Sequence, residues 1–358
     1  MKVILSALAA AVLVFPAVID AQPQAQCNFA IQDAPGNSGN AGGPGNSAGK
    51  RKATFNVPPG QSNRASEITL CSKGKAKKFK VKQSTPSGND GGQPLESWAG
   101  EADDGSSLTY VVDEQGHSTA SYVDMPENTI TDIYADADGN LQSVTKSGND
   151  YPDEADPEDL GIDLAVDEGD LNRRLGLRGA SSDQQQSHRR LSDDGSQLDV
   201  LVLWTADAEC RNSGLAAGCT RTASTKANIE ATIDLAITET NVGYAASGVN
   251  TQLRLVHSEF TSYVESAGFS TALSDLRSNS GVANLRAQKG ADIVALLIDD
   301  PQYCGLGYLG PRTDLMFSVT AWNCATGYYS FGHGKHTCIL CLYDQYLYYI
   351  YISYIYNS

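Results

Sequence analysis

Two continuous apolar stretches limit the folds open to this chain more than any other feature of its sequence. They are LDVLVLWT (residues 198–205) and ADIVALLIDD (residues 291–300), and neither alternates apolar with polar residues. Such runs are typical of strands buried on both faces of a sheet. Between them lie a stretch with apolar residues at helical spacing (220–248) and an alternating stretch, TQLRLVHSEF (251–260). Strand, helix, strand, helix, strand predicts an α/β sandwich with a largely parallel sheet.

Three carboxylates of the helical stretch do not fit its apolar spacing. Glu230, Asp234 and Glu239 fall away from the positions of Ile229 and Ile233 on a helix with 3.6 residues per turn. We expect them to form the solvent-facing side of that helix.

The part before residue 197 has a different composition. Residues 22–51 are rich in Gly, Asn and Ser and are predicted to be a flexible leader. Residues 52–150 alternate apolar and polar residues between turn signals, which predicts a small β-rich module. Residues 151–196 form an acidic, polar linker. Its dibasic pairs, Arg173-Arg174 and Arg189-Arg190, are either processing sites or part of an ordinary linker.

The first residues have the features of a secretory signal. Lys2 precedes an apolar run, and the small-residue pattern ends at Ala21, so residues 1–21 are predicted to be cleaved. We therefore expect a secreted, extracellular protein that has no membrane segment once the signal is removed. Export implies an oxidising compartment, in which the eight cysteines are expected to be bridged. Cys210 with Cys219, and Cys304 with Cys324, could each close a short loop, although sequence does not fix the connectivity.

The charge of the chain bears on its partners. A formal net charge of -16 argues against a nucleic-acid partner, because phosphate binding needs clustered cations. The one basic cluster, KGKAKKFKVK (73–82), is predicted to be the wet face of an edge strand, with a polyanion-binding patch as the alternative.

The stretch DLMFSVTAWNCATGYYSFGH (314–333), together with the two apolar stretches, resembles the metzincin zinc metalloendopeptidases. The likeness is to their reprolysin-like (adamalysin-related) branch and covers residues 198–333. It implies an α/β metzincin-like catalytic domain with a mixed, largely parallel sheet (197–333), incomplete in its C-terminal part. It also implies zinc as cofactor, protein or peptide substrates, a zymogen, and a propeptide formed by residues 52–150.

The resemblance also assigns site residues. It implies that the strand Ser318, Val319, Thr320, Ala321 and Trp322 is the sheet edge on which substrate peptides pair.

His333 matches the first zinc ligand of a His-Glu-x-x-His helix. The pattern then fails, because Gly334 stands at the position of the catalytic glutamate, and His336 follows after three residues rather than four. His336 is only a weak candidate ligand, and no residue is assigned as catalytic. HGKHTCILC (333–341) could instead be a small zinc knuckle, but its two ligand pairs are spaced too tightly for one tetrahedral ion.

Residues 334–358 are rich in tyrosine and show no helical or strand period. We interpret this tail as aberrant, the product of reading through an intron that begins within codon 334. The chain would then be an inactive form of a zinc metalloendopeptidase. A catalytically dead homologue that acts as a secreted peptide-binding module is the alternative, and an unrelated disulfide-bonded structural protein is the third.

Overall fold

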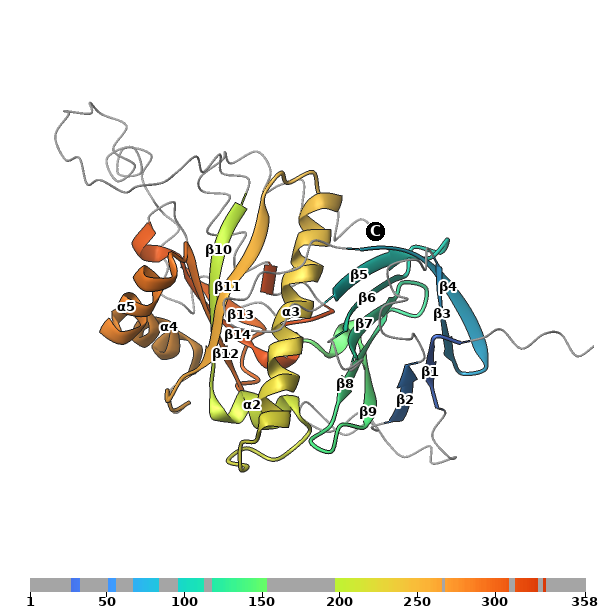
Figure 1. Ribbon diagram of the computed structural model, residues 1–358, viewed down its shortest axis with the longest axis horizontal. Coiled ribbons are helices and arrows are strands. Elements are labelled where there is room, and N and C mark those ends of the chain that lie inside the picture. The colour runs from blue at the N-terminus through green and yellow to red at the C-terminus, as the bar shows by residue number, and fades with distance from the viewer. Residues whose placement is uncertain are drawn as a thin grey trace, which may run out of the picture.

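The computed structural model describes residues 27–32, 51–55, 67–83, 96–112, 118–152, 197–265, 268–308, 313–327 and 331–332. A barrel of strands and a five-stranded sheet lie on opposite sides of one long helix, α3 (Ala223–Ala246), as Figure 1 shows. Helix α3 contacts β11 of the sheet on one side and β5, β6 and β7 of the barrel on the other.

The barrel is closed by nine strands in the order β1-β2-β9-β8-β7-β6-β5-β4-β3. Neighbouring strands are antiparallel except for β1 and β3, whose parallel pairing of Phe29 with Leu70 closes the ring. Its interior is an apolar core that includes Phe29, Phe79 and Tyr110. The strands are β1 (Phe29–Ile31), β2 (Arg51–Phe55), β3 (Glu67–Ser72), β4 (Lys75–Gln83), β5 (Glu96–Glu101), β6 (Ser107–Val112), β7 (Ser118–Asp124), β8 (Thr129–Ala135) and β9 (Leu141–Ser147).

The five-stranded sheet has the order β11-β10-β12-β14-β13. The pairs along β11, β10, β12 and β14 are parallel, and β13 is antiparallel to β14. Helix α3 packs on one face of the sheet, and α4 covers the other face at β13 and β14. The strands are β10 (Gln197–Trp204), β11 (Gln252–Phe260), β12 (Ile293–Ile298), β13 (Gly305–Gly307) and β14 (Phe317–Ala321). The remaining helices are α2 (Ala206–Asn212), α4 (Gly268–Ser278), α5 (Ser280–Lys289) and the 3₁₀ turns η2 (Gly148–Asp150), η3 (Thr313–Leu315) and η4 (Trp322–Cys324).

The predicted fold class, an α/β metzincin-like fold with a largely parallel sheet, is wrong. Strands outnumber helices in the described residues, and nine of the strands form a closed barrel that an α/β fold does not contain. The apolar stretches do form β10 and β12 where expected. The barrel escaped prediction because its closure depends on pairing between strands about 40 residues apart or more, which local alternation does not reveal. One of these strands, β1, lies in the segment expected to be a flexible leader.

The basic run from Lys73 to Lys82 is not an edge strand, which corrects the prediction. Strand β4 pairs with β3 on one side and β5 on the other. Its lysines also meet carboxylates of the barrel: Lys78 lies 2.7 Å from Glu67 and Lys80 lies 2.9 Å from Asp103. Much of the positive charge is therefore balanced locally, and nothing here favours a polyanion site.

Three disulfides are present in the described residues. Cys210–Cys219 and Cys304–Cys324 confirm the two predicted short loops. Cys27–Cys71 ties the residues before β1 to β3. Cys338 and Cys341 lie outside the described residues. None of the helices in the described ranges has the length and apolar character needed to span a membrane.

Candidate functional site

The strand expected to pair with substrate is not at the edge of its sheet. Residues 318–321 belong to β14, which pairs with β12 on one side and β13 on the other, and Trp322 begins η4. The backbone of β14 is therefore engaged on both sides, and the edge position belongs to β13. The sequence of β13, Gly-Leu-Gly, carries none of the β-branched or aromatic residues that indicate a strand, so the error could not be seen from sequence.

Phe331 and Gly332 lead directly into His333, and both are held by helix α3. The Phe331 side chain is 0% exposed and packs in the core between α3 and the sheet. The Tyr244 hydroxyl donates to the Gly332 carbonyl at 3.1 Å. A Cβ on Gly332 would lie 2.8 Å from Cγ2 of Thr240, so any other residue there would require Thr240 to shift. The C-terminal half of α3 thus fixes where the chain enters the predicted zinc-binding segment.

His333, Gly334 and His336 lie outside the described residues, as do the predicted processing sites Arg173, Arg174, Arg189 and Arg190. Their predicted roles therefore stay predictions.

The 3₁₀ turn η4 and the residues after it, up to Gly327, are attached to the barrel. The Thr326 hydroxyl donates to Asp132 of β8 at 3.1 Å, and Lys146 of β9 donates to the Asn323 carbonyl at 3.0 Å. Lys146 and Asp132 also form a salt bridge of 2.9 Å. The barrel therefore contacts the chain only a few residues before the predicted metal ligand.

Gly327 occupies the tightest point of this contact. Its φ of +71° belongs to the left-handed region that favours glycine. A Cβ at this position would run into Ile130 of the barrel and lie 3.2 Å from the Ser121 hydroxyl oxygen. The Gly327 N–H donates to the Glu239 carboxylate of α3 at 2.8 Å. Barrel, turn and helix therefore meet at one glycine.

The prediction that three carboxylates of α3 face solvent is wrong for two of them. Asp234 is 6% exposed and Glu239 is 3% exposed. Glu230 is partly buried and lies 3.5 Å from Lys226 one turn away. The helix has a polar side, as its sequence indicates, but the barrel covers that side.

Burial changes the acidity of Glu239. Desolvation raises the pKa of its carboxyl to about 8, and the negative charge of Asp132 adds to this effect. The Gly327 N–H and the Ser121 hydroxyl act in the opposite direction without cancelling it. Glu239 is therefore largely protonated at neutral pH while the barrel is in place.

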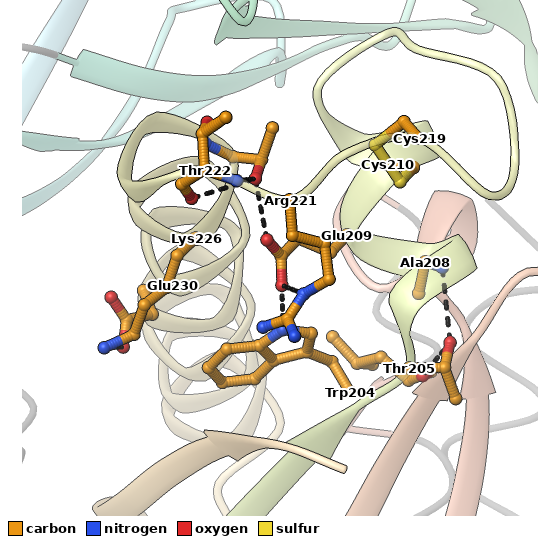
Figure 2. A network of polar contacts seen from close by, with 12 residues as sticks. Trp204, Thr205, Ala208, Glu209, Cys210, Cys219, Arg221, Thr222, Lys226 and Glu230 are labelled. Atoms are coloured by element: carbon orange, nitrogen blue, oxygen red, sulfur yellow. Dashed lines mark hydrogen bonds and ion pairs between the residues drawn. A yellow bond between two sulfur atoms is a disulfide. The ribbon is translucent and has the colours of Figure 1, made fainter. Parts of the chain in front are cut away.

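A second buried carboxylate, Glu209 of α2, lies at the centre of the contacts drawn in Figure 2. It is 0% exposed and accepts from the indole of Trp204 at 2.8 Å, from Arg221 Nε at 2.7 Å and from the Thr225 hydroxyl at 2.7 Å. The Arg221 guanidinium also stacks over the ring of Phe260 at 3.4 Å. Both carboxylate oxygens are occupied by protein donors, which is typical of a structural carboxylate rather than a reactive one.

A third acidic group, Glu265, links the carboxyl ends of β10 and β12. Glu265 accepts from the Thr205 hydroxyl and, at 2.7 Å, from the backbone N–H of Asp299. Asp299 accepts from Arg211 Nε and from the indole of Trp322, each at 3.0 Å. Burial raises the pKa of Glu265. These contacts tie the strand ends together, and sequence reasoning missed Glu265 because it follows β11 in a loop without a motif.

The described residues do not form a metal-binding site. Across the described ranges, no group of three or more His, Cys, Asp or Glu side chains is placed to hold a metal ion. In the sequence, His333 is followed by neither a glutamate nor a histidine at the required spacing. The residues present do not fit a three-histidine zinc site, and we derive no catalytic step through zinc.

Three relatives of this chain are named peptidyl-Asp metalloendopeptidases. It is 32% identical over 220 residues to a peptidyl-Asp metalloendopeptidase of Stenotrophomonas maltophilia strain R551-3, which covers 58% of this chain and 47% of that protein. It is 39% identical over 112 residues to a protein of the same name from strain K279a, covering 30% and 27% of the two chains. It is 37% identical over 112 residues to another from Xanthomonas campestris pv. campestris, with the same coverage.

This chain spans less than half the length of each of these relatives. No model of a known protein family matches it. Among solved structures, metalloproteinase-II from Bacteroides fragilis aligns with 76% of this chain and 80% of its own, at 10% identity and a TM-score of 0.41, which is too low to carry an argument. The sequence similarity alone relates the chain to metalloendopeptidases.

Proposed function

We propose that this chain comes from a secreted, zinc-dependent metalloendopeptidase and that, as written, it does not hydrolyse peptides. The observation that carries the first part is the 32% identity over 220 residues to a protein named for that activity. Because the relatives are named peptidyl-Asp metalloendopeptidases, we extend the proposal to peptide or protein substrates that contain aspartate. The placement in the reprolysin-like branch depends only on the stretch that ends at His333.

The second part of the proposal follows from the residues after His333. A histidine alone holds zinc weakly, and the glycine at position 334 cannot accept a proton. The residues from Gly334 onward are, in this proposal, a misread segment that replaces the remainder of the metal-binding helix.

We propose that the barrel is the propeptide of this peptidase, removed by cleavage within residues 151–196 at Arg173-Arg174 or Arg189-Arg190. Its contacts with Asn323 and Thr326, just before the predicted ligand, support this role. The polar side of α3 supports it too, because a surface that becomes exposed after processing needs residues that are stable in water. Secretion is supported by the three disulfides, since such bonds persist in oxidising compartments.

The assay that tests this function uses the purified chain and a fluorogenic peptide that contains aspartate, with and without a zinc chelator. We expect no hydrolysis above background, because the sequence has no glutamate at position 334 to act as a base and no second histidine at position 337 to bind the metal. The Stenotrophomonas relative serves as the positive control and should lose its activity in the chelator. Cleavage by this chain that the chelator abolishes would contradict the proposed inactivity.

A further inference from the structure

Glu239 is a buried carboxyl that the proposed peptidase function does not use. It belongs to α3, and its Oε2 accepts the Gly327 N–H at 2.8 Å. Ser121 of β7 and Asp132 of β8 lie close enough to affect its acidity. The carboxyl therefore stands at the point where the helix, the barrel and the turn before Phe331 meet.

Among the residues that the structure describes, the charged groups around Glu239 do not neutralise it. Lys146 of β9 is at the same contact, but it donates to Asp132 at 2.9 Å and to the Asn323 carbonyl at 3.0 Å. Asp132 carries a negative charge toward Glu239, and Asp234, also on α3, is a second buried carboxylate on the helix. An ionised carboxylate that is buried without a cation costs several kcal/mol, so the neutral acid is favoured while the barrel is docked.

The position of Glu239 on α3 makes this cost depend on the barrel. Asn228 donates from its side-chain amide to the Asp136 carbonyl of the barrel at 3.3 Å. Glu239 lies eleven residues further along, which is about three helical turns, and so faces the same way. The opposite side of α3, with Ile229, Ile233 and Ile237, packs on the sheet. Lifting the barrel would therefore return Glu239 to water and leave the sheet-facing core covered.

We propose that docking of the barrel against α3 is coupled to protonation of Glu239. The docked state is therefore most stable at acidic pH and becomes less stable as the pH rises. The inference goes beyond the proposed peptidase function and does not require it, because it concerns the contact and not hydrolysis.

The direction of the pH dependence follows from the pKa of Glu239 with the barrel docked and with the barrel undocked. With the barrel docked the pKa of Glu239 is raised to about 8, whereas its ordinary value is 4.5. A raised pKa means that the contribution of Glu239 to docking is complete below about pH 4.5. It decreases as the pH rises and is lost above about pH 8. One coupled proton changes the opening equilibrium by up to about tenfold per pH unit in that interval.

The test is amide hydrogen exchange in the full chain, with the Gly327 amide as the reporter, at intervals from pH 5 to pH 9. Protection factors remove the intrinsic pH dependence of exchange. In the unsubstituted chain we expect the protection of Gly327 to fall by up to about a thousandfold between pH 5 and pH 8. The E239Q variant keeps a carbonyl oxygen that can accept the Gly327 N–H but cannot ionise, and its protection should stay level.

E230Q is the matched control, because it makes the same chemical change on the same helix beside Lys226. In E230Q, the protection of the Gly327 amide should depend on pH as it does in the unsubstituted chain. A second variant, D132N, removes a negative charge that raises the pKa of docked Glu239, so its loss of protection should end at a lower pH and be smaller in total. If E239Q does not fold, the change in the pH profile of Gly327 protection in D132N tests the proposal by itself. Equal pH profiles of E239Q and the unsubstituted chain, or an unshifted profile of D132N, would overturn the proposal and leave Glu239 a fixed acceptor.

Discussion

Replacing Glu209 by alanine is expected to lower the free energy of unfolding by about 3–5 kcal/mol. The substitution removes the acceptor of two donors, the indole of Trp204 and the charged Arg221, and one of the two acceptors of the Thr225 hydroxyl. Removing one partner of a buried charge pair costs more than the pair itself contributes, because the remaining charge stays desolvated. Chemical denaturation with urea, followed by tryptophan fluorescence, measures the change.

The comparison for this prediction is Glu230→Ala. Glu230 is also a glutamate beside a cation, but its partner Lys226 is exposed, and surface pairs of this kind contribute about 1 kcal/mol or less. A Glu209→Ala variant that unfolds at the same urea concentration as Glu230→Ala would show that the contacts in Figure 2 contribute little to stability.

Replacing Phe331 by alanine should cost about 3–5 kcal/mol, the usual range for truncating a fully buried phenylalanine. The side chain belongs to the core between α3 and the sheet, together with residues such as Ile233 and Ile237. The alanine variant would leave a cavity beside α3 and remove the apolar contact that positions the residues before His333. Thermal unfolding followed by circular dichroism gives the loss in stability.

Phe331→Leu is the matched control, because it keeps most of the apolar volume and should cost about 1 kcal/mol. Tyr244→Phe adds a second comparison, since it removes the hydroxyl that bonds to the Gly332 carbonyl, a loss of about 1 kcal/mol. If Phe331→Ala were no less stable than Phe331→Leu, the segment before His333 would not be packed against α3 as described.

The parts of the fold that sequence predicted are those that local pattern determines. Strand β12 is apolar and buried along its whole length, and β10 is so from Val200 to Trp204, so their runs of Val, Leu and Ile indicate them directly. Helix α3 has caps and apolar spacing, and the cysteines at 210 and 219 are close enough in the chain to form their loop. These features need no knowledge of distant segments.

The parts of the fold that the sequence did not predict depend on contacts between segments that are distant in the chain. The barrel closes through strands such as β1 and β3, which local pattern does not pair. The side of α3 that carries Glu239 is polar, and whether it faces water or another part of the chain is decided by the barrel. The edge of the sheet belongs to β13, whose glycines give no strand signal.

The candidate site also has a part that the sequence predicted and a part that it did not. The resemblance pointed to the stretch ending at His333, and the structure shows how Tyr244 and Thr240 hold the residues just before it. The two buried carboxylates, Glu209 and Glu239, were not identified as such, because each stands in a helical sequence where glutamate is common on the surface. Only their burial distinguishes them.

Our central proposal is that this chain comes from a metalloendopeptidase and that its sequence departs from those of its relatives after His333. Sequencing of cDNA across codon 334 tests it most directly. The account predicts a transcript in which a glutamate codon replaces Gly334 and a histidine stands at position 337, followed by the rest of a peptidase domain. An abundant transcript that reads Gly-Lys-His at residues 334–336 and continues into the tyrosine-rich tail would contradict it.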